Sequence, residues 1–408
     1  MNSSSILGHW KKCTGTIEGA HVVLHTDTGH VLTGNSINCS RIPWDHGPPW
    51  CRRNSSLCFP PKPTPPAPAP AVDHVKHVHV TSMNHLDLGF TLPGHKGATA
   101  LEVLTQYVGP YFSKALDTAD QLAKIGINYT YTTHAWLVSH VVDCPQGVST
   151  KYPCPNASAL NRFKAGVKSG AISWHAGAFN LEPEAIDNQT FRWQVQLGHH
   201  LDDMFGLPHK ITMSQRDVPG LTRAAIPLLV QEGVQAVSVG VNTFSGPPFF
   251  DDQGPNTHRI FRWVDPPSNT SVLAMWHPRG YGGTRVADCV VLQNFSHALC
   301  PYFIGDNGGP PTAKQMANIL SQLRKTFPKA VVEVSTFDNF VGALALEPAV
   351  REALPRSTLE VGDTWIWGYV NVLSLQLLVR AYVCLVLPFL SPSMSVTGWR
   401  RTRPRRRK

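Results

Sequence analysis

The sequence predicts an α/β fold, either a seven-stranded-type parallel β/α barrel or an open parallel sheet, preceded by a small β-rich disulfide module. Three observations support this prediction. Four of the nine cysteines fall before residue 60, among short β-like runs, and a proline-dense stretch follows them. Beyond that stretch, short apolar strand-like runs alternate with longer helical patterns. Such alternation is typical of parallel strands joined by crossover helices.

The chain divides into four predicted segments. Residues 1–59 form the β-rich module, which its cysteines would staple because so short a chain buries little apolar surface. Residues 60–73 are rich in proline and alanine, and proline at this density favours an extended, semi-rigid linker. Residues 74–368 form the α/β domain. Residues 369–408 combine an apolar segment with a basic tail, and their role stays open.

Within the α/β domain, strands are expected at the apolar extended runs and helices at the amphipathic stretches between them. The predicted strands are Val75–Thr81, Ile127–Thr133, Ala171–His175, Lys210–Ser214, Gln235–Val239, Ser271–His277 and Ala330–Ser335. The predicted helices are Ala98–Lys124, Leu221–Glu232 and Thr312–Phe327. Parallel α/β sheets gather their functional residues in the loops after the carboxyl ends of the strands. Candidate functional residues are therefore expected at those positions.

The net charge of +9 does not indicate a nucleic-acid-binding protein. Seven of the nine excess positive charges lie between Arg400 and Lys408, so the body of the chain is nearly neutral. A basic terminus of this kind is more often solvated than a reader of DNA. Residues 372–390 are apolar, but Arg380 near their middle would cost roughly 2.5 to 3.5 kcal/mol on membrane insertion. We favour an unrelated terminus over a membrane span.

The other cysteines indicate an oxidising compartment. Cys144 with Cys154 and Cys289 with Cys300 are closely spaced couples that suit disulfides stapling local loops. Eight Asn-x-Ser/Thr sequons are consistent with a glycoprotein of the secretory pathway, secreted or lumenal. The first residues of the chain lack the apolar run of a signal peptide, which opposes that localisation.

His85 and Asp87 are the first candidates for a metal site. They follow an alternating strand-like run, and residues two positions apart in extended backbone point to the same side. An imidazole nitrogen and a carboxylate oxygen could therefore converge on one zinc ion, which would need further ligands. A His-x-Asp pair also arises by chance as a turn with a solvated carboxylate, so the pair alone does not establish a site.

The stretch Asn84–Phe90 resembles the His-x-Asp-x-Gly-Trp/Phe signature that opens the catalytic domain of class II α-mannosidases, glycoside hydrolase family 38. It is most similar to a poorly characterised branch that reads His-Leu-Asp-x-Gly-Phe-Thr. Three later stretches follow in the family's order, and the set covers residues 75–368. The resemblance implies a zinc-dependent, retaining catalytic domain with His85, Asp87 and Asp217 as zinc ligands. Beyond this range the resemblance ends, where the family continues with helical and β domains.

Asp217 is the candidate nucleophile. It follows the strand-like run Lys210–Ser214 and precedes Pro219 and Gly220, after which a helical pattern begins. The nucleophile of the family lies in a similar setting, so the resemblance assigns Asp217 both as nucleophile and as an oxygen ligand of zinc. An Asp before Pro-Gly is also an ordinary turn residue.

Asp306 is the candidate general acid/base. The stretch Ile304–Thr312 resembles the family's Gly-Asp-Gly-Gly-Gly-Gly-Pro-Thr loop or its Gly-Asp-Asp variant, which implicates Asp306. Retaining glycosidases need such a second carboxyl group about 5 to 5.5 Å from the nucleophile. This chain has Asn307 where the variant has its second Asp, and a shift of one residue would leave the loop without an acid. A Gly-rich loop is otherwise simply a turn.

Five residues are candidates to line a sugar pocket. An aromatic ring in place of the family's Trp or Phe could form a floor beneath a sugar ring, and polar side chains could bind its hydroxyl groups. One acidic candidate lies in a Gly-Asp-Thr-Trp stretch that resembles the same branch. The candidates are Phe90, His175, His277, Tyr281 and Asp363. A lone His in a strand is more often simply packed and hydrogen-bonded.

These observations predict a retaining, zinc-dependent, α-mannosidase-like glycoside hydrolase that acts on a carbohydrate. Two other functions are compatible with the same residues: a catalytically inactive carbohydrate-binding protein, or another metal-dependent hydrolase such as a polysaccharide deacetylase. The enzyme hypothesis is weakened because the family completes its zinc shell with a further histidine, for which this chain has no matching segment. The sequence does not indicate the sugar, the linkage or the oligomeric state.

Overall fold

The computed structural model divides the chain into two compact units, Met1–Pro68 and Ala69–Lys408. The residues that it describes are 14–18, 21–25, 31–35, 71–88, 99–144, 154–218, 220–241, 260–277 and 280–360. In the first unit, β1 (Thr14–Glu18), β2 (His21–His25) and β3 (Val31–Asn35) form an antiparallel sheet in sequence order. The predicted apolar segment at 372–390 and the basic tail lie outside the described residues.

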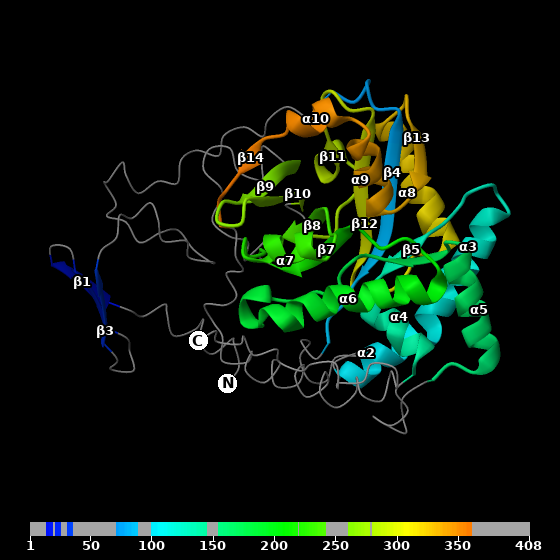
Figure 1. The fold of residues 1–408 in the computed structure, drawn as a ribbon, viewed down its shortest axis with the longest axis horizontal. Helices are drawn as coiled ribbons and strands as arrows, with labels where there is room; N and C mark the ends of the chain where they lie inside the picture. The colour runs from blue at the N-terminus through cyan, green and yellow to red at the C-terminus, as the bar shows by residue number, and fades with distance from the viewer. Residues whose placement is uncertain are drawn as a thin grey trace, which may run out of the picture. The chain divides into compact units, whose positions relative to one another are not determined.

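The second unit alternates strands with helices, as predicted (Figure 1). Its strands are β4 (His77–His85), β5 (Tyr131–Thr133), β6 (Ile172–Trp174), β7 (Thr212–Val218), β8 (Ala236–Val241), β9 (Ile260–Asp265), β10 (Thr270–His277), β11 (Val290–Val291), β12 (His297–Asp306), β13 (Val331–Val334) and β14 (Arg356–Ser357). Its α-helices are α2 (Ala100–Gln106), α3 (Phe112–Ala123), α4 (Ala135–Val142), α5 (Ala157–Lys168), α6 (Asn188–Phe205), α7 (Ala225–Gln231), α8 (Ala313–Thr326), α9 (Phe337–Ala345) and α10 (Pro348–Glu352).

The strands form two sheets, in the orders β11-β12-β4-β5-β6 and β14-β9-β10-β8-β7, with β13 also paired to β4. Main-chain hydrogen bonds join the two sheets: Ala176 N–H donates to Thr212 O across β6 and β7, and Phe303 N–H of β12 donates to Tyr281 O just after β10. Seven parallel strands in the described part of the chain therefore succeed one another around a common interior and form a strand ring, in the order β12, β4, β5, β6, β7, β8 and β10. This arrangement confirms the predicted α/β class with its seven-stranded, barrel-like sheet.

The strand β4 is central because both of its edges are paired. It pairs in parallel with β12 along one edge and with β13 and β5 along the other (Figure 1). Every residue of β4 after His77 is buried, which agrees with a strand covered on both faces. Met83 faces an inner cluster that includes Met275 and Phe303, whereas Val78 packs in a cluster that includes apolar residues of α3 and α8. Neighbouring strands on both sides therefore fix the position of the carboxyl end of β4, where His85 lies.

The helical stretch predicted at Ala98–Lys124 is interrupted. A π-helical turn, Tyr107–Tyr111, separates α2 from α3 and contains Pro110. Proline cannot donate a main-chain hydrogen bond, and a π turn is a common way for a helix to accommodate such a break. The turn is also where two tyrosine side chains leave the helix toward the candidate site.

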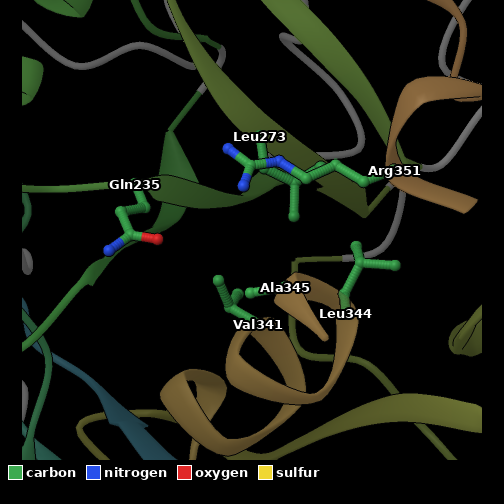
Figure 2. A pocket seen from close by; sticks show the side chains of 6 residues that line it. All are labelled: Gln235, Leu273, Val341, Leu344, Ala345 and Arg351. Atoms are coloured by element: carbon green, nitrogen blue, oxygen red, sulfur yellow. The ribbon is translucent and has the colours of Figure 1, made fainter. Parts of the chain in front are cut away.

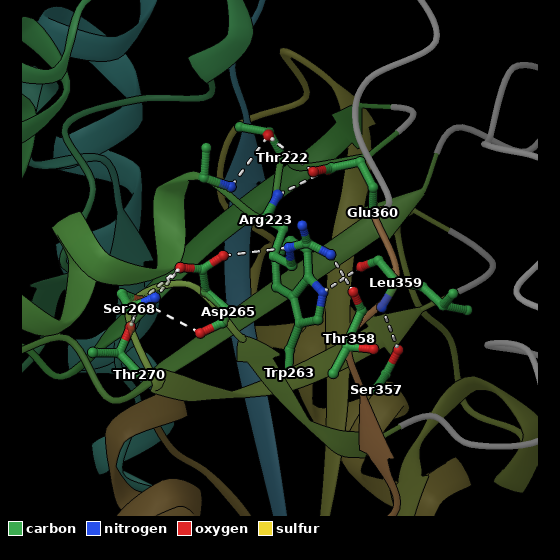
Figure 3. Close-up of polar contacts among 11 residues, drawn as sticks. Thr222, Arg223, Trp263, Asp265, Ser268, Thr270, Ser357, Thr358, Leu359 and Glu360 are labelled. Atoms are coloured by element: carbon green, nitrogen blue, oxygen red, sulfur yellow. Dashed lines mark hydrogen bonds and ion pairs between the residues drawn. The ribbon is translucent and has the colours of Figure 1, made fainter.

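The last described residues are fastened to the β9–β10 hairpin, which the sequence did not predict. Trp263 Nε1–H donates to Leu359 O at 2.9 Å, and Arg223 N–H donates to a Glu360 carboxylate oxygen at 2.8 Å (Figure 3). Arg223 also forms an ion pair with Asp265, at 3.4 Å (Figure 3). These bonds hold β14 and the residues after it against the second sheet.

Both predicted local cysteine couples are disulfides, Cys144–Cys154 and Cys289–Cys300. Cys289 follows a 3-10 turn and Cys300 lies in the middle of β12, so this bond fastens the β11 segment to a central strand. Among the helices in the described part of the chain, none is long and apolar enough to cross a membrane.

Candidate active site

Three predicted residues converge at the carboxyl end of the sheet. His85 ends β4, and its Nε2 lies 3.0 Å from Asp87 Oδ1 and 3.7 Å from Asp217 Oδ2. Tyr281 joins them, because its hydroxyl donates to Asp217 Oδ2 at 2.8 Å and its ring meets the His85 ring edge-on. The His85 side chain is 4% exposed, while Asp87 and Asp217 are 19% and 22% exposed. The cluster therefore has a buried base and two carboxylates that solvent can reach.

Asp217 reaches this cluster through an irregularity in β7. Its φ of 59° lies in the left-handed region, which non-glycine residues seldom adopt. The register between β7 and β8 shifts between Arg216 and Val218. A bulge of this kind re-aims a side chain, and such strained positions are concentrated at functional sites. The distortion places the carboxylate beside His85.

Asn307 joins the end of β12 to the residues after β4. Its Oδ1 accepts from Asp87 N–H and its Nδ2 donates to Asp87 O, both at 3.0 Å. Asp306 lies in register with His85, so its main chain stands beside the candidate site. Because the Asn307 amide is used to hold Asp87, the loop retains a single carboxyl candidate at Asp306, whose role stays a prediction.

Two tyrosines from the π-helical turn anchor the same loops. Tyr107 Oη–H donates to His85 O at 2.7 Å, and Tyr111 Oη–H donates to Asn307 O at 2.8 Å. Gly309, with a φ of 68°, packs directly on the Tyr111 ring, where a Cβ would approach ring carbons to 2.8 Å. The main chain on both sides of the candidate site is therefore positioned by side chains far away in sequence.

Asn180 is a site residue that the sequence did not reveal. Its Oδ1 accepts from Arg216 N–H at 3.1 Å and its Nδ2 donates to Arg216 O at 2.9 Å, which fixes the orientation of the amide. The same Nδ2 lies 3.2 Å from His85 Nδ1. Since this nitrogen is a donor, His85 Nδ1 accepts and His85 Nε2 carries the proton that it donates to Asp87. No local pattern around Asn180 distinguishes it from an ordinary loop residue.

A second histidine, His134, was also missed. His175 Nδ1 accepts from the N–H groups of Gly177 and Ser214, so His175 Nε2 donates to His134 Nδ1, 2.8 Å away. His134 Nε2 is then a buried donor, and it has no hydrogen-bond partner within the described ranges. Burial, followed by the charges of His175 and His85, holds the pKa of His134 well below its usual value. Both histidines are therefore neutral, and His134 offers one N–H next to the cluster.

His175 and His277 are buried inside the protein and do not line an open pocket as predicted. Both ring nitrogens of His175 are used within the protein, and burial, followed by the charge of Arg216, lowers the pKa of His175 to about 3. His277 is 1% exposed and its Nε2 lies 3.1 Å from Ser238 Oγ inside the strand ring. Phe90 and Asp363 lie outside the described residues. Of the three predicted sugar contacts that the structure describes, Tyr281 is the one that contacts His85 and Asp217.

The donors around His85 suit zinc in kind. Imidazole nitrogen and carboxylate oxygen are zinc ligands, with bonds of roughly 2.0 to 2.2 Å that put neighbouring ligands about 3.4 Å apart. The separations of 3.0 and 3.7 Å from His85 Nε2 agree with that spacing. Within the described part of the chain, however, no group of three or more His, Cys, Asp or Glu side chains closes into a metal cage. Binding through His85 Nε2 would also require its proton to move to Nδ1, which faces the Asn180 amide nitrogen.

A shallow pocket elsewhere in the unit is unrelated to this cluster. It is lined by Gln235, Leu273, Val341, Leu344, Ala345 and Arg351 (Figure 2). Gln235 directly precedes β8 and Leu273 lies early in β10, so the pocket is at the amino ends of these strands. Parallel sheets place their chemistry at the opposite ends.

Solved structures resemble this chain, although no family model and no curated protein matches it. An α-mannosidase from Enterococcus faecalis V583 aligns with a TM-score of 0.52 at 15% identity, over 70% of this chain and 31% of that chain. A glycosyl hydrolase family 38 protein from Enterococcus faecalis gives 0.42 at 12% identity, over 71% and 29%. A 4-α-glucanotransferase from Thermococcus litoralis gives 0.42 at 10% identity, over 71% and 42%.

Of these three similarities, the first is the one that supports a common fold. Over 70% of its length the chain thus has a fold like that of this α-mannosidase, which agrees with the resemblance of its sequence motifs. The chain spans about a third of the α-mannosidase that it matches.

Proposed function

We propose that this chain is a retaining glycoside hydrolase of the α-mannosidase type. The observation that carries the proposal is the meeting of His85, Asp87 and Asp217 at the carboxyl edge of the strands, in a fold like that of an α-mannosidase. Parallel α/β enzymes place catalytic side chains at this edge. The two local disulfides agree with the proposed secretory compartment, where glycans are abundant.

In the proposed reaction, a carboxylate oxygen of Asp217 bonds to the anomeric carbon as the bond to the leaving oxygen breaks. Asp306 gives its proton to that leaving oxygen. Asp306 then takes a proton from water, whose oxygen attacks the anomeric carbon and releases Asp217 with the original configuration restored. The Tyr281 hydroxyl orients the Asp217 carboxylate through its bond to Oδ2.

His85, Asp87 and Asp217 would hold the zinc ion of this proposal. When bound, zinc would supply Lewis-acid chemistry and orient neighbouring sugar hydroxyls. Asp87 is kept in place by the paired bonds of Asn307, and the His85 main chain by Tyr107.

The decisive experiment is labelling with a 2-deoxy-2-fluoro mannoside that has a good leaving group, followed by intact mass and peptide mapping. We expect one adduct on the peptide that contains Asp217, and none in Asp217→Asn. Asp203→Asn, which removes an exposed carboxylate on α6, is the matched control and should label normally. Labelling of a different acidic residue would refute Asp217 as the nucleophile.

Metal content tests the zinc site separately. We expect one zinc per purified chain and a large loss in Asp87→Ala. Equal zinc in both proteins would contradict the assigned ligands.

A catalytically inactive carbohydrate-binding protein is the second candidate. It is favoured by one observation: His85 Nε2 donates to Asp87, and no three-ligand cage closes within the described ranges. Saturable binding of mannosides without turnover or adduct would support this function, and measured turnover would exclude it.

A further inference from the structure

The interior of the strand ring contains a buried arginine with unused hydrogen-bond donors. Arg216 is 0% exposed, and its guanidinium carbon lies 5.1 Å and 5.5 Å from the ring centres of Phe303 and Phe337. Its Nη2–H donates to Ser238 Oγ at 2.6 Å. Its Nε and Nη1 have no hydrogen-bond partner, and none of the ion pairs between described residues involves Arg216. Among the described residues, no carboxylate therefore neutralises this positive charge.

The neighbouring strands are shaped to accommodate this side chain. Gly240 of β8 lies in register with Arg216. A Cβ at Gly240 would lie 2.6 Å from both Cδ and Nη1 of Arg216, and 2.5 Å from Gly280 O. Any residue larger than glycine would displace the guanidinium, so the glycine at position 240 leaves the space that the Arg216 side chain occupies.

A second unused donor lies on the same side of β7. Ser214 is two residues before Arg216, and alternate residues of a strand point to the same face. The Ser214 hydroxyl is buried and has no hydrogen-bond partner among the described residues. Ser214 and Ser238 are in register on β7 and β8, so both hydroxyls are near the guanidinium. Arg216 Nε, Arg216 Nη1 and the Ser214 hydroxyl are thus donors that no described group accepts from, and an anion could accept from them.

We propose that Arg216 and Ser214 bind one small monovalent anion, chloride or a similar halide, inside the strand ring. A buried charge is strongly destabilising unless an opposite charge or hydrogen bonds compensate it. Guanidinium and hydroxyl N–H and O–H groups would surround the ion, while the Phe303 and Phe337 rings exclude water. A small spherical ion suits this interior better than a carboxylate or phosphate, because the main chain at Gly240 packs closely against the Arg216 side chain. This inference does not depend on the proposed function.

Thermal unfolding of the full chain in chloride-free buffer tests the proposal. Sodium chloride and sodium bromide are titrated against sodium gluconate at constant ionic strength. We expect a saturable rise of the midpoint temperature, roughly 2 °C or more, with both halides and none with gluconate, because an ion that binds the folded state alone stabilises it. Crystals grown in bromide should show an anomalous peak within hydrogen-bond distance of Arg216 Nε or Nη1.

Two variants separate a specific site from a general salt effect. Ser214→Ala removes one donor but keeps the arginine, so it should fold and need at least a threefold higher halide concentration for half saturation. Arg162→Met removes an exposed arginine paired with Asp117 and Asp120, and its halide response should equal that of the unmodified protein. The same response in Ser214→Ala as in the unmodified protein, or a bromide-grown crystal with no anomalous peak beside Arg216, would overturn the proposal.

Discussion

At the scale of single residues, the candidate site depends on side-chain amides that bond main chain in both directions. Asn307 holds Asp87, and Asn180 holds the Arg216 peptide group while contacting His85. Gln215 acts in the same way, because its amide exchanges two bonds with the Leu181 main chain. These amides fix the orientation of the candidate site residues, as supporting residues around metal ligands commonly do.

The contact between Asn180 and His85 predicts an effect on zinc affinity. The Asn180 amide nitrogen faces His85 Nδ1, so it opposes the Nδ1–H form that zinc binding through Nε2 requires. Asn180→Asp replaces that donor by an acceptor, and we expect zinc to bind about 10-fold more tightly in competition with a chelating dye.

The matched control for this substitution is Asn161→Asp, which adds the same charge on the exposed surface of α5. It should leave zinc affinity unchanged. Weaker zinc binding by Asn180→Asp than by the unmodified protein would show that the tautomer assignment is wrong.

At the scale of elements, β4 carries the candidate site at one end and a histidine cluster at the other. His79 Nδ1 lies 2.9 Å from Ser335 Oγ, and His79 Nε2 lies 2.9 Å from His297 Nδ1. The His297 ring also stacks on His77. Burial, then the charges of His297 and His77, lowers the pKa of His79 to about 4. The amino end of the central strand therefore tolerates these imidazoles only while His79 is neutral.

This cluster predicts acid sensitivity. The pKa of His79 is about 4 when folded and 6.5 when unfolded, so the unfolded state binds more protons between these values. Stability should therefore fall as the pH decreases from about 6.5 to about 4, with an upper limit of roughly 3 kcal/mol from this residue. Urea unfolding of His79→Gln should show a flatter pH dependence in that window. An unchanged slope would exclude His79 as the source.

The disulfide at β12 predicts a second effect on stability. Cys289 and Cys300 are both buried and are 11 residues apart. A disulfide that closes so short a loop contributes roughly 2 to 3 kcal/mol by restricting the unfolded chain. The double variant Cys289→Ala, Cys300→Ala should lose that amount in urea unfolding. An unchanged free energy of unfolding would mean that this bond is not formed in the purified protein.

At the scale of the whole molecule, every described residue of the candidate site belongs to the unit Ala69–Lys408. The strands β4 to β14, the supporting amides and both disulfides that we describe are contained in the same unit. The chemistry should therefore be independent of the first unit.

Deletion of residues 1–68 tests this independence. We expect the shortened protein to keep its zinc content and the rate of labelling at Asp217, because no described contact of the site comes from the deleted part. A loss of more than about 10-fold in labelling rate, with unchanged far-UV circular dichroism, would show that the first unit contributes to the site.

Much of this architecture follows from local patterns in the sequence. Alternating apolar residues located β4 and β10, spacing identified the pairs Cys144–Cys154 and Cys289–Cys300, and the short motifs predicted that His85, Asp87 and Asp217 share one site. The strands and the cysteine pairs are readable because each depends on residues a few positions apart, where backbone geometry fixes the direction of side chains. The meeting of His85 and Asp87 with Asp217 was instead implied by the resemblance to a known family.

The tertiary structure decided what surrounds those residues. The Asn180–His85 and Asn307–Asp87 contacts join residues that are 95 and 220 positions apart. No periodic pattern in the local sequence predicts contacts between residues so far apart. The left-handed backbone of Asp217 and the buried guanidinium of Arg216 likewise arise where strands from distant parts of the chain meet. Local sequence thus determined which chemical groups end the strands, whereas packing between strands determined their orientation, protonation and partners.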